Sequence, residues 1–405
     1  MQSKLLTLFR IGVTLAILLT VYESFFTPGD KRQQTTSGIN QRQLNITNAG
    51  KSDFKIISEE LGTLIDHGWA LNSERIKINY EDSRCLFPAK LRYKAFNNYQ
   101  LQLGDILVQL KIQFFYPFCK ASILVYGDSL QNKYETVNSS TIRGHCPEID
   151  FHKTELSSKY GDGDIGIDID LDPKSEAIKF SLQARKLSLN VTVQISRQNY
   201  DEQFSVLPVD DVQTNFYASS KSAGLKVSGN YLYKGKNNTC GDKECFASYD
   251  IGRGIFCHQT QWYSASLTTV LPGTNEIFSL FFGDGIGTHF NKTLDKAMED
   301  FLMINGKHYK LDITRLENNN LTSKHIFRTI GGIDRIYPKR GCDVKFEPLQ
   351  GSPIHQGFDF GFYAFKQDIL VGNFTGTCHF EQNGPLRVIK FRNVRGVVEH
   401  VTARW

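Results

Sequence analysis

Alternation of apolar and polar residues, interrupted by turn sequences, is the feature that most restricts how this chain can fold. In KLSLNVTVQIS (186–196), one face collects Leu187, Leu189, Val191, Val193 and Ile195. Asn-Gly pairs at 305–306 and 383–384 lie between strand-like runs, a strong hairpin signal. Helix candidates are short: 293–300, and 54–65, which suits either helix or strand. Strands closely spaced by turns with little helix predict an all-β sandwich or barrel.

The N-terminus predicts entry into the secretory pathway. Lys4 and Arg10 precede an apolar run over 11–22, which is short for a membrane span of about 20 residues and suits a signal-peptide core. No A-x-A cleavage site follows, and Arg10 lies where a cytoplasmic flank would be. A cleaved signal peptide and an uncleaved signal anchor over 1–26 both remain open. The body is then secreted or attached to the membrane as a type II protein. Residues 27–52 are polar and predict a flexible stem.

Sequons and cysteines agree with an oxidising lumen. N-x-S/T sequons predict glycosylation at Asn45, Asn138, Asn190, Asn237, Asn291, Asn320 and Asn373. At Asn190 the alternation points the acceptor to solvent. The eight cysteines form an even set, which favours disulfides over metal ligation. Cys240 and Cys245 flank a Gly-containing turn and are the expected local pair.

Other function classes find little support. The net charge of +5 includes no long basic run, so no nucleic-acid partner is predicted. G-x-G-x-x-G at 161–166 is followed by a strand, which argues against nucleotide binding. The alternating aspartates that follow lack the Gly and Glu of an EF-hand loop and favour a solvated acidic face. We predict no metal and no cofactor. A type II membrane glycosyltransferase using Asp-x-Asp is an outside alternative, because the helices of a nucleotide domain are missing.

Residues 249–267, YDIGRGIFCHQTQWYSASL, concentrate the candidate chemistry. The glycines beside Arg253 permit a tight turn or close backbone approach. Period-two alternation places Phe256, His258, Thr260, Trp262 and Ser264 on one face, which suits the lining of a cavity. Two plainer interpretations remain open: a structural His258, and an Asp250–Arg253 ion pair that only fixes the turn.

The chain resembles a domain-of-unknown-function family of predicted double-lipocalin proteins, related to carotenoid hydratases and to a yeast-type survival factor. The resemblance spans 62–405. It rests on HGWALN (67–72), AKLRYKAFNNYQ (89–100), DIGRG (250–254), QWYSAS (261–266), FFGDGIG (281–287), FLMINGKHYKL (301–311), VKFEPL (344–349), VGNFTG (371–376) and EHVTARW (399–405). The leader, the sequons and the many cysteines depart from the family's usual pattern, as does Gln261 before Trp262-Tyr263.

The resemblance implies two packed lipocalin-like antiparallel barrels, assigned to 53–225 and 226–405, with a ligand cavity. For hydratase relatives it implies a protonated acid near an aromatic group. Asp250 would then be the acid and His258 would position water. Arg253, Trp262, Tyr263, Ser264 and Asp284 are the predicted ligand-binding residues. His400, Arg404 and Trp405 are expected to close one barrel end.

We therefore expect a lumenal or secreted glycoprotein that binds or carries a hydrophobic lipid- or isoprenoid-like molecule in a β-barrel cavity. The alternative is a cofactor-independent hydratase or isomerase-like enzyme that uses Asp250 on an apolar unsaturated substrate. The N-terminal segment would provide a membrane contact if it is not cleaved.

Overall fold

A computed structural model describes residues 54–55, 57–58, 60–61, 68–71, 76–82, 92–115, 118–127, 134–142, 156–172, 174–209, 214–241, 245–256, 259–285, 299–311, 314–316, 325–329, 341–349, 353–359, 364–381 and 385–404. The predicted leader, stem and Trp405 lie outside these ranges, as does most of the helix predicted at 293–300. No helix within them is long and apolar enough to cross a membrane.

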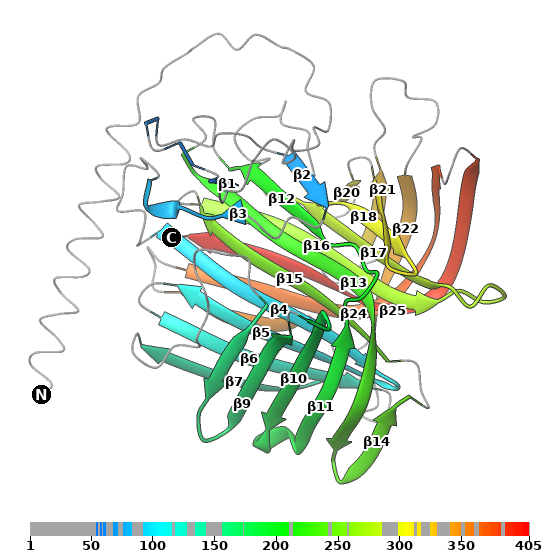
Figure 1. Ribbon diagram of the computed structural model, residues 1–405, viewed down its shortest axis with the longest axis horizontal. Helices are drawn as coiled ribbons and strands as arrows, with labels where there is room; N and C mark the ends of the chain where they lie inside the picture. The colour runs from blue at the N-terminus through cyan, green and yellow to red at the C-terminus, as the bar shows by residue number, and fades with distance from the viewer. Residues whose placement is uncertain are drawn as a thin grey trace, which may run out of the picture.

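The described chain forms two large antiparallel sheets, which confirms the predicted all-β fold (Figure 1). The first sheet follows the order β7 (Tyr134–Ile142), β6 (Phe118–Gly127), β5 (Ile106–Phe115), β4 (Tyr93–Leu103), β15 (Cys245–Ile255), β13 (Phe216–Tyr233), β11 (Leu189–Ser196), β10 (Ala177–Ala184), β9 (Ile165–Asp172) and β8 (Ser158–Gly161). β12 (Gln203–Pro208) and β14 (Lys236–Cys240) pair with β13, and β2 (Gly68–Leu71) pairs with β12. The outer strands β7 and β8 approach each other, because Ser139 Oγ lies 2.5 Å from the Tyr160 hydroxyl. The sheet therefore curls toward a barrel.

The second sheet has the same curled form. Its order is β19 (Lys307–Lys310), β18 (Phe301–Ile304), β17 (Ile277–Asp284), β16 (Gln259–Val270), β25 (Leu386–Arg404), β24 (Ala364–Glu381), β22 (Gly341–Pro348), β21 (His325–Thr329) and β20 (Thr314–Leu316), and β23 (Ile354–Asp359) pairs with β24. β1 (Phe54–Lys55) and β3 (Ile76–Lys77) form a small parallel pair, and η2 (Tyr80–Asp82) and η4 (Arg185–Leu187) are short 3₁₀ turns. The chain passes between the sheets after Ile255, whereas the predicted division at 225/226 falls inside β13.

The two predicted hairpins and the alternating buried and exposed faces of the strands follow from the local sequence. Asn305 and Gly306 both have positive φ and join β18 to β19, as a type I′ turn requires. β24 and β25 pair through the predicted second hairpin, with Glu381 opposite Leu386. In β11 the alternating Leu, Val and Ile side chains are buried, and Asn190 is exposed. The Asp-rich β9 is an alternating strand with Asp168 and Asp170 exposed.

Two disulfides join described cysteines. Cys240–Cys245 confirms the predicted local pair, and Cys342–Cys378 links β22 to β24. Disulfides of this kind indicate an oxidising compartment. Of the sequon residues in the described ranges, Asn138, Asn190 and Asn237 are exposed and Asn373 is half-buried. Their glycosylation remains a prediction.

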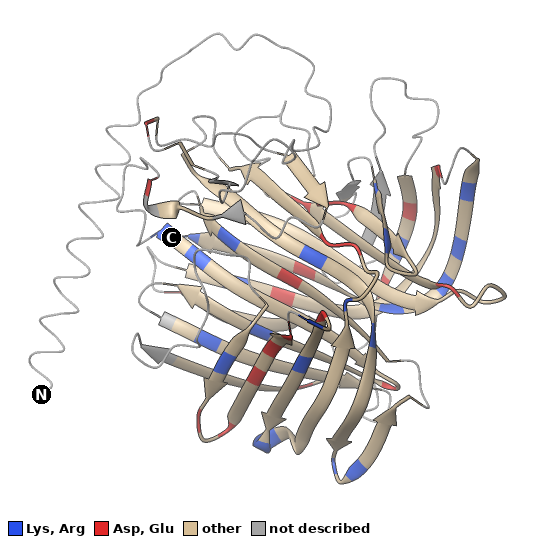
Figure 2. Cartoon of the chain, viewed as in Figure 1, with Lys and Arg blue, Asp and Glu red and all other residues tan. Residues whose placement is uncertain are grey.

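Each curled sheet has its own apolar core, and the two sheets meet across a third layer. The first core includes Tyr99, Phe180 and Leu225, and the second includes Phe278 and Phe346. Between the sheets, separate apolar clusters surround a polar centre. One packs Leu107, Leu124 and Tyr126 on Ile354, Ile369, Val371 and Val397, and another packs Phe115 on Phe365, Val401 and Ala403. Charged positions therefore occur in the middle of the molecule as well as at its rim (Figure 2).

Candidate functional site

A small cavity of about 40 Å³ lies between the two sheets. Strands β4, β5, β13 and β15 of the first sheet and β16, β24 and β25 of the second contribute its walls. Its lining residues are Lys94, Phe96, Asn98, Gln113, Phe115, Tyr217, Lys221, Asp250, Phe256, Trp262, Ser264, Glu299, Phe365, Gln367, Glu399 and Val401. The interiors of the curled sheets hold the two apolar cores, so this cavity belongs to the interface and not to a barrel interior.

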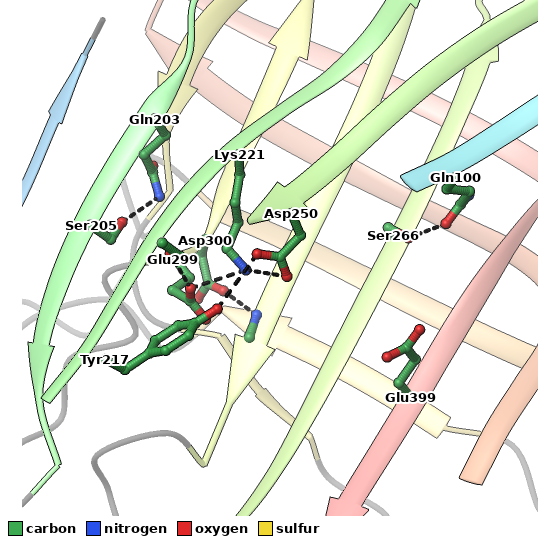
Figure 3. A network of polar contacts seen from close by, with 12 residues as sticks. Gln100, Gln203, Ser205, Tyr217, Lys221, Asp250, Ser266, Glu299, Asp300 and Glu399 are labelled. Atoms are coloured by element: carbon green, nitrogen blue, oxygen red, sulfur yellow. Dashed lines mark hydrogen bonds and ion pairs between the residues drawn. The ribbon is translucent and has the colours of Figure 1, made fainter. Parts of the chain in front are cut away.

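One end of the cavity holds a buried lysine between two carboxylates (Figure 3). Lys221 on β13 lies directly opposite Asp250 on β15. Its Nζ lies 2.8 Å from Asp250 Oδ2 and 3.0 Å from Glu299 Oε1. Ser219 Oγ also donates to Glu299 Oε1 at 2.8 Å. Because Glu299 lies two residues before β18, this cluster connects the two sheets.

Burial makes the acid of this cluster weaker than an ordinary carboxyl group. Burial raises the pKa of Asp250 to about 6, and the nearby Glu299 carboxylate adds to the increase while the Lys221 ammonium opposes it. For Lys221, burial acts to lower the pKa, but the two carboxylates outweigh it and the net pKa is raised. Lys221 therefore stays protonated, while Asp250 changes its protonation state close to neutral pH.

An aromatic wall adjoins the acid. The Tyr217 hydroxyl lies 3.5 Å from Asp250 Oδ1, and burial raises its pKa well above the usual value, so it remains a neutral donor. The Tyr217 ring lies 5.9 Å from the Phe96 ring and 5.8 Å from the Phe256 ring, and Phe256 stacks on Trp262 at 6.0 Å. Aromatic faces of this kind stabilise a positive charge.

A second carboxylate cluster forms around Glu399 on β25. Lys111 Nζ donates to Glu399 Oε1 at 2.6 Å, and the Gln109 amide donates to the same oxygen. Gln367 Nε2 donates to Glu399 Oε2 at 2.9 Å. Burial lowers the pKa of Lys111, although Glu399 opposes this effect. Glu399 is thus fixed by donors from both sheets.

Amide oxygens near Glu399 add hydrogen-bond acceptors to the cavity. Asn98 Oδ1, Gln113 Oε1 and Gln367 Oε1 are buried and find no hydrogen-bond partner among the described residues. Buried amide oxygens normally accept a hydrogen bond. This part of the cavity therefore suits a ligand group that donates hydrogen bonds, such as a hydroxyl group or a water molecule.

The structure brings several predicted site residues together. Asp250 lines the cavity, and so do Phe256, Trp262 and Ser264 of the predicted common face. Their face is built from two strands in different sheets, β15 and β16, and not from one continuous strand. His258 lies outside the described residues.

Arg253 does not lie in the cavity. The plainer interpretation of an Asp250–Arg253 ion pair that fixes a turn is wrong, because both residues belong to strand β15 and Asp250 pairs with Lys221. The Arg253 guanidinium is fully buried on the opposite face and donates to Phe96 O at 3.0 Å and Asn97 Oδ1 at 2.9 Å. Of the two alternatives for the flanking glycines, close approach is confirmed: a Cβ at Gly252 would lie 2.1 Å from Phe96 Cζ.

Tyr263 and Asp284 lie on the other face of the second sheet. The Tyr263 ring stacks on His400 at 4.2 Å, and Gln261 Nε2 lies 2.7 Å from His400 Nε2. Asp284 Oδ2 accepts a hydrogen bond from Leu316 N at 3.1 Å. Arg404 forms an ion pair with Asp359 at 3.2 Å. None of these residues lines the cavity. That His400 and Arg404 close one barrel end remains a prediction.

Sequence analysis missed Lys221, Glu299, Glu399, Lys94 and Tyr217. A usable signal was present for two of them. Lys94 is the only charged residue of β4, and Lys221 is the only charged residue in the fully buried part of β13, 216–225. A charge placed there has to meet a partner or a cavity, because isolated buried charge is unfavourable. The pairing of residues more than 70 positions apart carries no local signal.

Comparison with known proteins places the chain in a family. Solved structures similar to it include a putative AttH from Nitrosomonas europaea (12% identity, 77% of this chain and 92% of that chain, TM-score 0.40) and kievitone hydratase from Nectria haematococca (11%, 77% and 89%, 0.43). CghA is similar at 9% identity, covering 79% of this chain and 92% of that chain, with a TM-score of 0.39. No curated protein matches. The family described as a domain of unknown function, DUF2804, matches residues 45–405, and the chain belongs to this family.

Proposed function

We propose that the protein is an acid–base enzyme that protonates a carbon–carbon double bond of an apolar substrate, with Asp250 as the acid. The observation that carries this proposal is the Asp250 carboxyl group, whose pKa is raised to about 6 in a cavity with an aromatic wall. A general acid works best when its pKa lies near the operating pH. Asp250 meets this condition without a cofactor.

The proposed step is balanced by the groups present. Neutral Asp250 transfers its proton to one alkene carbon, and the π electrons form the new C–H bond. The neighbouring carbon becomes a cation, which the faces of Phe256 and Trp262 stabilise. The Asp250 carboxylate formed is stabilised by the Lys221 ammonium at 2.8 Å. Loss of a neighbouring proton to this carboxylate gives an isomer, whereas addition of water followed by proton return gives an alcohol.

The size of the cavity favours reaction over storage. Pockets that enclose a whole small-molecule ligand have volumes of about 300–1,000 Å³. About 40 Å³ is enough for the reacting group of a longer molecule or for a few water molecules. The carrier function expected from sequence would need more space than this cavity offers, so the cavity between the sheets supports the enzyme alternative better.

An isotope experiment tests the proposal. Asp250→Asn is expected to retain substrate without converting it. The variant is therefore incubated with an apolar cell extract and isolated again, and the molecule bound to it is identified by mass spectrometry. Wild-type protein should then convert that molecule in D₂O with one deuterium incorporated at carbon, at least about a hundredfold faster than Asp250→Asn. Exposed Asp168→Asn is the matched control and should convert it as wild type does. Equal deuterium incorporation by wild type and Asp250→Asn would contradict the proposal.

A further inference from the structure

An open groove of about 1030 Å³ crosses the outer face of the first sheet. Residues of β8, β9, β10, β11 and β13 line it, and β9, β10 and β11 lie side by side in Figure 1. The alternating apolar side chains of these strands point the other way, into the first core. The groove is therefore separate from the cavity that contains Asp250, and the proposed reaction does not use it.

The groove is polar, and the charges in its described lining balance. Ser181, Thr192 and Gln194 are exposed there and provide hydroxyl and amide groups. The charged lining residues are two aspartates and two lysines, and they lie opposite each other on neighbouring strands, as Asp170 does with Lys179. The exposed side chains described in the lining include no aromatic or large apolar group. Such a surface suits a neutral ligand that is rich in hydroxyl and amide groups.

A predicted carbohydrate acceptor lies at one end of the groove. Asn190 begins a sequon that ends at Thr192, and both side chains are exposed on one face, because residues two apart on a strand point the same way. Gln194 lies about 13 Å from Asn190 along β11, and β8 lies three strand spacings, or about 14 Å, from β11. A glycan attached to Asn190 therefore begins beside the groove and can extend along it.

Small residues leave room for sugars beside Asn190. Its cross-strand row leads through Gln183 on β10 to Gly166 on β9 and Gly161 on β8. Nothing lies within 4 Å of a Cβ placed at Gly161. On the other side, Asn190 lies opposite Leu232 of β13, which is 40% exposed. Leu232 offers an apolar contact for the acetamido methyl group of an N-acetylglucosamine ring.

We infer that this groove holds the N-linked glycan of Asn190, so that part of the carbohydrate belongs to the folded surface of the first sheet. Hydroxyl and acetamido groups of the sugars form hydrogen bonds with Ser181, Thr192 and Gln194. Each of these bonds replaces a bond to water and contributes little by itself, so several of them together hold the glycan. The covered face is then closed to other molecules. The inference requires glycosylation of Asn190 and is independent of the reaction proposed at Asp250.

Deglycosylation of the native protein, followed site by site, tests it. The full-length chain is produced in a secreting host that attaches only high-mannose glycans, and it is digested with endoglycosidase H without denaturation. Glycopeptide mass spectrometry gives the rate of release at each sequon. Release at Asn190 should be at least about tenfold slower than at the exposed Asn138 and Asn237, which corresponds to a docking free energy of about 1.4 kcal/mol. After denaturation the three rates should agree.

A variant of the groove separates docking from simple crowding of Asn190 within a strand. Ser181→Ala combined with Gln194→Ala removes hydrogen-bond partners and leaves the sequon intact, so release at Asn190 should approach the rate at Asn138. The control is Lys345→Ala, an exposed position of β22 in the second sheet, which should keep the slow release. Wild-type release at Asn190 as fast as at Asn138, an Asn190 without a glycan, or slow release that persists in the groove variant would each overturn the inference.

Discussion

Asp250 shows how position in the tertiary structure changes an ordinary side chain. The residue sits in a strand, yet its carboxyl group faces the cavity and is 19% exposed there. Burial and Glu299 stabilise its neutral form, while Lys221 stabilises its charged form. The outcome of this competition is a group that titrates close to neutral pH.

The pH dependence of stability follows from this pKa. In the unfolded chain an aspartate ionises near pH 3.9, whereas folded Asp250 ionises near pH 6. Between these values the folded state binds one more proton, so the contribution of Asp250 to the free energy of unfolding falls as the pH rises, by about 1.4 kcal/mol per pH unit. In urea unfolding from pH 4 to pH 6, the free energy of unfolding of wild type minus that of Asp250→Asn should therefore fall as the pH rises. The exposed Asp168→Asn should retain the wild-type slope, and an unchanged slope in Asp250→Asn would contradict the raised pKa.

At the scale of elements, β15 is a strand whose glycines let other groups approach closely. A Cβ at Gly254 would lie 2.5 Å from the carbonyl oxygen of Phe216 on the paired strand β13. Backbone atoms in a central strand cannot move aside without breaking ladder hydrogen bonds. The contact of Gly252 with Phe96 has the same effect on the other neighbouring strand, β4. The DIGRG segment (250–254) therefore allows close packing of the neighbouring strands and also contains Asp250.

Gly254→Ala should destabilise the protein. Overpacking of this kind costs about 1–3 kcal/mol, and we expect a loss of this size in the free energy of unfolding, measured with urea. Gly161→Ala is the matched control, because nothing lies within 4 Å of a Cβ at Gly161 in β8. The control should change stability by less than about 0.5 kcal/mol. Equal effects of the two substitutions would show that close approach does not explain Gly254.

At the scale of the whole molecule, buried ion pairs join the two curled sheets. Lys111 of the first sheet bonds Glu399 of the second, and Lys221 of the first bonds Glu299, which precedes β18. Apolar clusters lie between the same two sheets. Removal of one partner from a buried pair leaves a charge without compensation, which is more unfavourable than removal of both.

A double-mutant cycle measures this connection. Glu399→Gln and Lys111→Met should each destabilise the protein by about 3–5 kcal/mol, and the double variant should lose clearly less than the sum. The exposed pair Lys186–Asp164, with side chains 67% and 41% exposed, provides the control cycle. Its coupling should be below about 1 kcal/mol. Unfolding is followed with urea at pH 7, and additive effects at Lys111 and Glu399 would contradict an energetic link between the sheets.

Three of the predicted site residues line the same cavity, and their role there remains a prediction. Asp250, Trp262 and Ser264 were chosen from a single stretch, and the structure places all three in the cavity. Arg253, Tyr263 and Asp284 were chosen from the same or similar motifs but point to other faces of the strands. Neighbours in sequence on a strand alternate between faces, so proximity in a motif does not place side chains in one site.

The sequence by itself determined the strands, their alternating faces, the hairpins and the Cys240–Cys245 pair, because these depend on contacts between residues close along the chain. Its motif order also determined the family. Only the tertiary structure decided that the cavity lies between the sheets, that Lys221 is placed between Asp250 and Glu299, and that Lys94 shares their cavity. Those outcomes depend on the packing of two sheets, which joins residues far apart along the chain, such as Lys111 and Glu399. Burial at that junction changes the pKa values of the side chains it encloses, and the partners that they meet there come from distant parts of the sequence.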